Sequence, residues 1–194
     1  MEKIEIAPLR KLILIGGSAG SLEVLLKVLP YLNPLNDFAI VIILHRKSSE
    51  DMTLENLIAL KTPIPVKEVE DKTPLLPGFL YIAPSDYHLL FEKNCLLSLD
   101  TSEKVNHSRP SIDVSFESAA DAFTTEVIGI LLSGANSDGT AGLIAIQNAG
   151  GITVVQNPET ADMSFMPAHA VANLNCDYIL DAAGILKFIN AATS

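Results

Sequence analysis

Short apolar runs rich in β-branched residues alternate along this chain with longer amphipathic segments, and this alternation constrains the fold more than any other feature. Such a chain forms parallel strands connected by helices that cover the faces of the sheet. The predicted strands are Lys11–Ile15, Phe38–Leu44, Val127–Leu132, Ile152–Val155 and Tyr178–Leu180. The predicted helices are Leu22–Leu32, Thr53–Leu60, Ile112–Phe123, Ala141–Ala149, Ala168–Leu174 and Ala182–Ala192, the last capped by Asp181. We therefore expect an α/β fold with a mostly parallel sheet.

The section between Ile64 and Leu99 has a different pattern, in which turn residues separate the alternating segments "PVKEVE", "GFLYIAP", "YHLLFE" and "CLLSL". Alternation over short segments is typical of antiparallel pairing, so we expect an antiparallel edge or hairpin insertion here. The chain has 194 residues, of which 48% are hydrophobic, and no Gly-, Ser- and Pro-rich linker divides it. We expect a single domain over residues 1–194.

The charge balance argues against a nucleic-acid partner. The chain has 13 Lys and Arg against 23 Asp and Glu, and the basic residues are scattered rather than gathered into a patch. No apolar run approaches the roughly 20 residues that cross a bilayer, and the N-terminus lacks a signal-peptide pattern, so we expect a soluble, cytoplasmic protein. Cys95 and Cys176 have neither a CxxC spacing nor a neighbouring histidine, which favours buried free thiols.

The stretch "LILIGGSAGS", Leu12 to Ser21, passes abruptly from aliphatic residues to glycine, alanine and serine. It does not fit the G-x-G-x-x-G pattern of a dinucleotide site, and it lacks the Gly-Lys-Ser/Thr of a P-loop. It does satisfy G-x-S-x-G, the pattern of a nucleophile turn, with Ser18 at a strand-to-helix junction. The alternative is that small residues merely permit close packing of the strand and helix, and this stretch alone favours that alternative.

Two other reactive residues are predicted to reach the same edge of the sheet. His45 follows the strand "AIVIIL", and Asp138 lies in the turn "LSGANSDGT" between a strand and a helix. The carboxyl ends of parallel strands are where open α/β folds place ligands. A serine needs a base, and the base needs an acceptor that orients it, so Ser18, His45 and Asp138 make a complete set. His107, in the polar loop "VNHSRPSID", is the rival base.

Several motifs in one order resemble the catalytic domain of the CheB-type chemotaxis protein-glutamate methylesterases. They run from "LILIGGSAGS" through "VIILH", "LLPGFLYIAPSDYHLL", "RPSIDVSFESAA" and "VIGILLSGANSDGTAGLIAIQNAGGITVVQNPETA" to "MPAHAV" and "DYIL". The resemblance implies a doubly wound, mostly parallel sheet with helices on both faces and an antiparallel hairpin. It also places the family's nucleophile, base and orienting acid on Ser18, His45 and Asp138.

By the same resemblance, the chain is expected to hydrolyse glutamyl methyl esters on chemoreceptor helices, and to deamidate selected glutamines, through an acyl-enzyme. The backbone N–H groups of Ala19 and Ala135 are the expected oxyanion donors, and no metal or organic cofactor is required. The first predicted strand begins at Lys11, so we expect no phospho-accepting receiver domain before it. The alternatives are a non-catalytic signalling or scaffold module of the same fold, and a serine esterase or amidase with another substrate.

Overall fold

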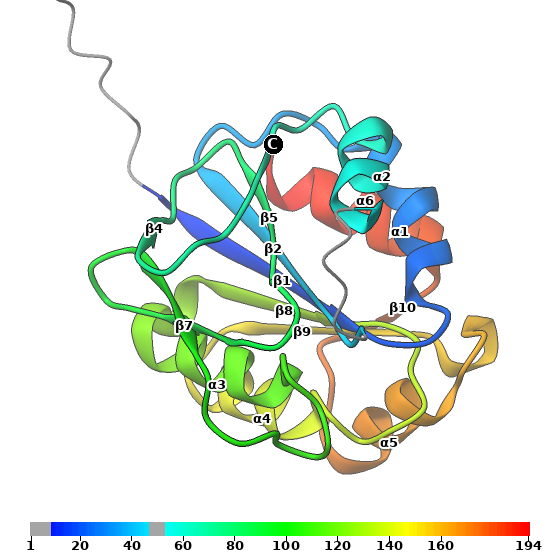
Figure 1. The fold of residues 1–194 in the computed structure, drawn as a ribbon. Helices are drawn as coiled ribbons and strands as arrows, with labels where there is room; N and C mark the ends of the chain where they lie inside the picture. The colour runs from blue at the N-terminus through cyan, green and yellow to red at the C-terminus, as the bar shows by residue number, and fades with distance from the viewer. Residues whose placement is uncertain (1–8, 47–52) are drawn as a thin grey trace, which may run out of the picture.

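The computed structural model describes residues 9–46 and 53–194, and in this part of the chain a seven-stranded sheet forms the centre of the molecule (Figure 1). All neighbouring strands of this sheet pair in parallel, in the order β10-β9-β8-β1-β2-β5-β3. The strands are β1 (Lys11–Gly17), β2 (Phe38–Leu44), β3 (Val66–Lys67), β5 (Leu80–Ile82), β8 (Val127–Leu131), β9 (Ile152–Gln156) and β10 (Tyr178–Leu180). The predicted α/β class with a mostly parallel sheet is confirmed.

Helices cover both faces of the sheet (Figure 1). On one face lie α1 (Ser21–Val28), α2 (Thr53–Lys61) and α6 (Ala182–Ala192), and on the other lie α3 (Ile112–Phe123), α4 (Thr140–Asn148) and α5 (Phe165–Asn173). None of these helices, within the described part of the chain, is long and apolar enough to span a bilayer.

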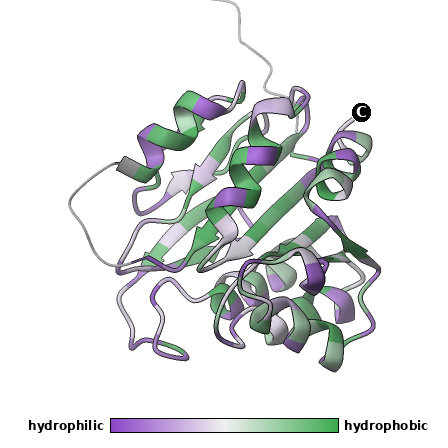
Figure 2. Cartoon of the chain, turned by 90° about the vertical axis from the view of Figure 1, so that its right-hand side faces the viewer, coloured by the Kyte–Doolittle hydropathy of each residue, from purple (hydrophilic) through white to green (hydrophobic). Residues whose placement is uncertain are grey.

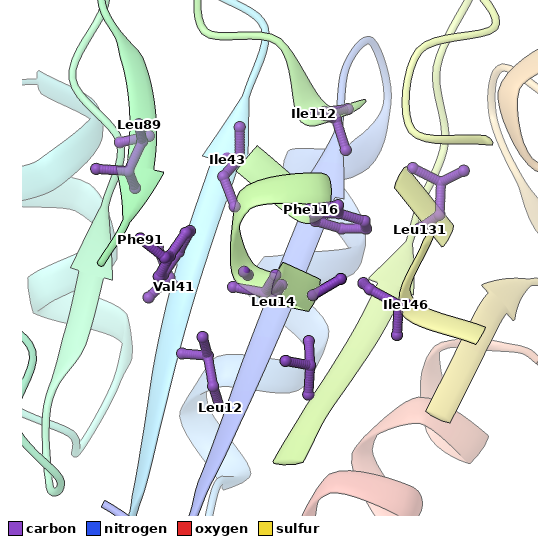
Figure 3. Close-up of a cluster of buried hydrophobic side chains, with 14 of the residues drawn as sticks. Leu12, Leu14, Val41, Ile43, Leu89, Phe91, Ile112, Phe116, Leu131 and Ile146 are labelled. Carbon is purple, nitrogen blue, oxygen red and sulfur yellow. The ribbon is translucent and has the colours of Figure 1, made fainter. Parts of the chain in front are cut away.

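The central strands are apolar along their whole length because both of their faces are covered. Every residue of β2 is buried, and successive residues of β1 alternate between two hydrophobic clusters. Leu12 and Leu14 pack with Phe116 of α3 in the cluster drawn in Figure 3, whereas Ile13 and Ile15 pack with the opposite layer of helices. In Figure 2 the central strands are coloured largely as hydrophobic, whereas the helices carry both hydrophobic and hydrophilic residues.

The section between Ile64 and Leu99 is only partly antiparallel. A separate three-stranded antiparallel sheet has the order β4-β7-β6 and consists of β4 (Thr73–Pro74), β6 (His88–Phe91) and β7 (Leu96–Asp100). The prediction was wrong for "PVKEVE" and "GFLYIAP", because β3 and β5 join the main sheet in parallel. The physical reason is burial: all three residues of β5 are buried, as expected of a strand covered on both faces.

Proline residues explain two shifted helix boundaries. Helix α1 ends at Val28 rather than Leu32, and a 3₁₀ turn containing Pro30 follows it. Helix α5 begins at Phe165 rather than Ala168, so that Pro167 lies in the first turn, where a missing N–H removes no helical hydrogen bond. Cys95 and Cys176 are free thiols but only partly buried.

Candidate active site

Three loops meet at the carboxyl ends of the adjacent strands β8, β1 and β2. The last paired residues of β1 and β2 are Gly17 and Leu44, so Ser18 and His45 leave neighbouring strands at the same level. The His45 N–H donates to the Gly17 carbonyl at 3.1 Å, and the Ser18 N–H donates to the Ser133 carbonyl, after β8, at 2.9 Å. The sheet register therefore places these loops side by side.

The small residues after β1 are required by the tightness of the turn. A Cβ atom on Gly17 would lie 2.5 Å from the Cβ atom of Ser21, and Gly20 has a φ of 81°, in the left-handed region that favours glycine. The Ser18 carbonyl accepts hydrogen bonds from the Ser21 N–H and hydroxyl, and the Ala19 carbonyl accepts one from the Ser133 hydroxyl. These bonds fix the backbone around Ser18 at the start of α1.

His45 and Asp138 are in direct contact, with 2.6 Å between His45 Nε2 and Asp138 Oδ2. Because a carboxylate only accepts, Nε2 carries a proton, and in the neutral form of the ring Nδ1 is the nitrogen without one. The Asn136 amide nitrogen lies 3.5 Å from Nδ1. Among the described residues, no hydrogen bond joins the Ser18 hydroxyl to His45. The structure thus pairs two of the three predicted groups and places Ser18 on the neighbouring strand end.

Asp138 is fully buried and surrounded by donors. Besides His45, its carboxylate accepts hydrogen bonds from the Ser111 hydroxyl and from the backbone N–H groups of Ile112, Asp113 and Gly139. Burial by itself would raise the pKa of Asp138, but the hydrogen bonds from His45 and from the amides of Asp113 and Ile112 outweigh it and hold the pKa below the ordinary value. Asp138 is therefore an ionised hydrogen-bond partner of His45.

A second buried carboxyl group, that of Asp113, lies beside Asp138. Burial raises the pKa of Asp113 to about 7, and the neighbouring charge of Asp138 acts in the same direction. The Oδ1 atom of Asp113 accepts from the N–H groups of Gly139 and Gly142, both at 2.8 Å. A neutral amide oxygen could accept the same two bonds.

Replacing Asp113 by asparagine is expected to flatten the pH dependence of stability. The pKa of Asp113 is higher in the folded chain than in the unfolded one. Its contribution to the free energy of unfolding is therefore fully present below about pH 4 and is lost as the pH rises through about 7. The free energy of unfolding should fall across this interval with a slope approaching about 1.4 kcal/mol per pH unit, and Asp113→Asn should remove that slope. Asp138 affects stability at lower pH. Its pKa is lower in the folded chain than in the unfolded one, so its contribution to the free energy of unfolding is lost only as the pH falls below about 4.

The measurement is urea unfolding of the wild type and of Asp113→Asn at a series of pH values from 4.5 to 8. Glu117→Gln is the matched control, because Glu117 lies on the same helix but is exposed. Equal pH slopes for wild type and Asp113→Asn would contradict the prediction.

Three residues of this site were missed by the sequence analysis: Ser111, Asp113 and Asn136. Ser111 is the N-cap of α3 and accepts from the Val114 N–H, a signal present in "RPSIDV" as a serine before an apolar helical run. The Asn136 side chain accepts from the Asp138 N–H, a local turn that asparagine commonly forms two residues before a backbone donor. Asp113 had no local signal, since its partners belong to a different helix.

The remaining histidines have other surroundings. His88 is fully buried, its Nδ1 accepts from the Ser111 N–H at 3.2 Å, and its Nε2 lies 2.9 Å from the Glu103 carbonyl, so it is a structural residue. His107 is exposed and lies on the wall of a pocket of about 410 Å³ that also reaches His45. The other lining residues are Arg46, Asp86, Lys104, Ser108 and Arg109.

Among the described residues, no group of three or more His, Cys, Asp or Glu side chains could hold a metal ion.

A serine turn beside a histidine paired with a buried aspartate, at the carboxyl edge of a parallel sheet, is an arrangement that many hydrolases share. Comparison with known proteins gives the family: residues 13–189 match the family model described as CheB methylesterase. The chain belongs to the CheB methylesterase family, and the resemblance found in its motifs is confirmed.

Two relatives and one solved structure show the extent of the similarity. A Leptospira interrogans protein with the provisional name of protein-glutamate methylesterase/protein-glutamine glutaminase is 41% identical over 175 residues, which are 90% of this chain and 91% of that protein. The protein-glutamate methylesterase/protein-glutamine glutaminase of Chromohalobacter salexigens is 37% identical over 164 residues, which are 83% of this chain and 46% of that protein. The crystal structure of the Thermotoga maritima CheB methylesterase catalytic domain has a TM-score of 0.87 and 30% identity, and the match covers 94% of this chain and 98% of that one.

Proposed function

We propose that this chain hydrolyses glutamyl methyl esters in a protein substrate, and can deamidate glutamine, by a serine mechanism. The observation that carries the proposal is the 2.6 Å contact between His45 and the buried, ionised Asp138, next to the Ser18 turn. The names of the relatives from Leptospira and Chromohalobacter support the substrate class.

In this mechanism, the Ser18 hydroxyl attacks the side-chain carbonyl of the glutamyl ester while His45 Nδ1 takes its proton. Asp138 stabilises the imidazolium that results. The tetrahedral intermediate collapses, the bond to the methoxy group breaks, and the imidazolium gives the proton to the departing methanol. Water then attacks the acyl carbon and loses a proton to His45. The bond between that carbon and the Ser18 oxygen breaks, His45 returns the proton to this oxygen, and the free glutamate side chain and the Ser18 hydroxyl are regenerated. The long contact between Asn136 and Nδ1 gives way when Ser18 approaches this nitrogen with substrate bound.

Ala19 and Ala135 supply the oxyanion donors. Among the described residues, neither the Ala19 N–H nor the Ala135 N–H donates a hydrogen bond, and both residues are exposed at the edge of the loops that meet here. The Ser18 N–H is already committed to the Ser133 carbonyl and is not available. Free N–H groups that point toward developing charge are what an oxyanion site requires.

The proposed partner is a methylated chemoreceptor cytoplasmic helix or a related signalling protein in the cytoplasm. The direct test is release of methanol from a methyl-esterified receptor fragment, followed over time and compared with an unesterified fragment. Absence of turnover, together with absence of labelling by a fluorophosphonate, would favour a non-catalytic signalling module. Labelling without turnover of this substrate would favour an esterase or amidase with another substrate.

We expect His45, rather than His107, to be the base. His45→Ala should lower ester hydrolysis by about 10³-fold or more, because general base catalysis and the pairing with Asp138 are lost together. His107→Ala should change the rate by less than about threefold, since His107 lies on an exposed loop without a carboxylate partner among the described residues. The two variants are compared for kcat on one methyl ester, and a larger loss in His107→Ala would overturn the assignment.

A further inference from the structure

The N-termini of α3 and α4 lie beside two buried carboxyl groups, those of Asp113 and Asp138. Asp113 belongs to α3 but binds the start of α4, and Asp138 lies just before α4 but binds the start of α3. Asp138 lies just before α4, yet its carboxylate accepts hydrogen bonds from the first two residues of α3. The donors are the N–H groups of Ile112, at 2.7 Å, and of Asp113, at 2.9 Å. Asp113 lies in the first turn of α3, yet its carboxyl accepts from Gly139 and Gly142 at the start of α4. Asp138 therefore caps α3 and Asp113 caps α4.

The two helices pack closely at this crossing, where glycines stand at the points of contact. A Cβ atom on Gly142 would lie 2.5 Å from the Phe116 Cβ atom and 3.2 Å from the Asp113 Cα atom. Gly139 has a φ of 97°, and a Cβ atom there would lie 2.5 Å from the Leu131 side chain. The missing side chains allow the backbone N–H groups of α4 to reach the Asp113 carboxyl directly.

We propose that Asp113 is a positioning residue for the catalytic acid: by holding the Gly139–Gly142 segment against α3, it fixes the Asp138 carboxylate in contact with His45. This inference rests on the proposed function, in which Asp138 orients the base. Asp113 makes no contact with His45 itself among the described residues, so its effect passes through Asp138.

The role depends on the acceptor atom more than on the charge of Asp113. Two helix N-termini supply partial positive charge at this point, and Asp138 already provides an ionised carboxylate. The ionisable groups around the pair are His45, which contacts Asp138, His88 of β6, which binds the Ser111 N–H, and His169 of α5, whose Nδ1 lies 2.9 Å from the Thr140 hydroxyl. Since Asp113 binds Gly139 and Gly142 through one oxygen, an asparagine can keep both bonds.

The experiment compares Asp113→Asn, which keeps the acceptor, with Asp113→Ala, which removes it, and uses Glu117→Gln on the exposed face of α3 as the control. The first readout is the downfield proton resonance of the His45–Asp138 hydrogen bond, identified by its loss in His45→Gln. The second is the division of the effect between kcat and KM on a glutamyl methyl ester. Asp113→Ser, which replaces the carboxyl by a shorter polar side chain, is the second variant if Asp113→Ala does not fold.

Asp113→Ala is expected to lose or broaden the downfield resonance and to lower kcat by about 10-fold to 100-fold with KM within about twofold, because the acid is displaced from the base. Asp113→Asn should keep the resonance and lie within about threefold of the wild-type kcat, as should Glu117→Gln. An unchanged resonance and kcat in Asp113→Ala would overturn the proposal, and so would a loss in Asp113→Asn as large as in Asp113→Ala. The resonance does not require turnover, so failure of the proposed function and failure of this inference give different results.

Discussion

Ser18→Ala is expected to abolish labelling by a fluorophosphonate and to lower ester hydrolysis by about 10⁴-fold or more, as the loss of the nucleophile does in serine hydrolases. The physical reason is that the acyl-enzyme cannot form, while the Ser18 carbonyl still accepts from Ser21 and the turn keeps its shape. The measurement is mass-spectrometric mapping of the label together with methanol release from a methyl ester.

The matched control is Ser164→Ala, an exposed serine before α5 whose side chain forms no capping hydrogen bond. It should leave labelling and turnover unchanged. Labelling that persists in Ser18→Ala, at whatever residue, would show that the nucleophile has been assigned to the wrong side chain.

Asp138→Asn is expected to fold and to lower kcat by up to about 10⁴-fold. In the wild type, Oδ2 accepts from both His45 Nε2 and the Ile112 N–H. An amide NH₂ in that place would face two donors, so His45 would lose the acceptor that fixes its tautomer and the charge that stabilises the imidazolium. The unpaired Ile112 N–H should also lower the free energy of unfolding by about 1–3 kcal/mol.

Circular dichroism and urea unfolding establish that the variant is folded, and kcat is then measured on the same methyl ester used for Ser18→Ala. Asp113→Asn is the natural control, since it makes the same chemical change in the neighbouring buried carboxyl. A near-normal kcat in Asp138→Asn would mean that another acid orients His45.

The predicted strands match the structure where the apolar residues of the segment itself indicate that it is buried. The run from Phe38 to Leu44 is apolar at every position and forms β2 with those bounds, because a strand covered on both faces has no solvent-facing residue. The short strand Leu80–Ile82 is equally buried but lay among alternating segments, and its partner β2 is distant in sequence. Pairing of this kind depends on which elements the chain brings together, so the local pattern could not distinguish a parallel strand of the main sheet from a strand of a hairpin.

The sequence by itself determined the α/β class, the family and the loops that carry Ser18, His45 and Asp138, because apolar periodicity and turn chemistry are local properties. Only the tertiary structure decided which nitrogen of His45 faces the acid, that Asn136 lies near the other nitrogen, and that Asp113 and Asp138 cap each other's helices. These contacts join residues from 25 to 93 positions apart. Their geometry follows from sheet register and helix packing. A hydrogen bond between residues far apart in the sequence produces no periodic pattern in the sequence, so it could not be predicted from it.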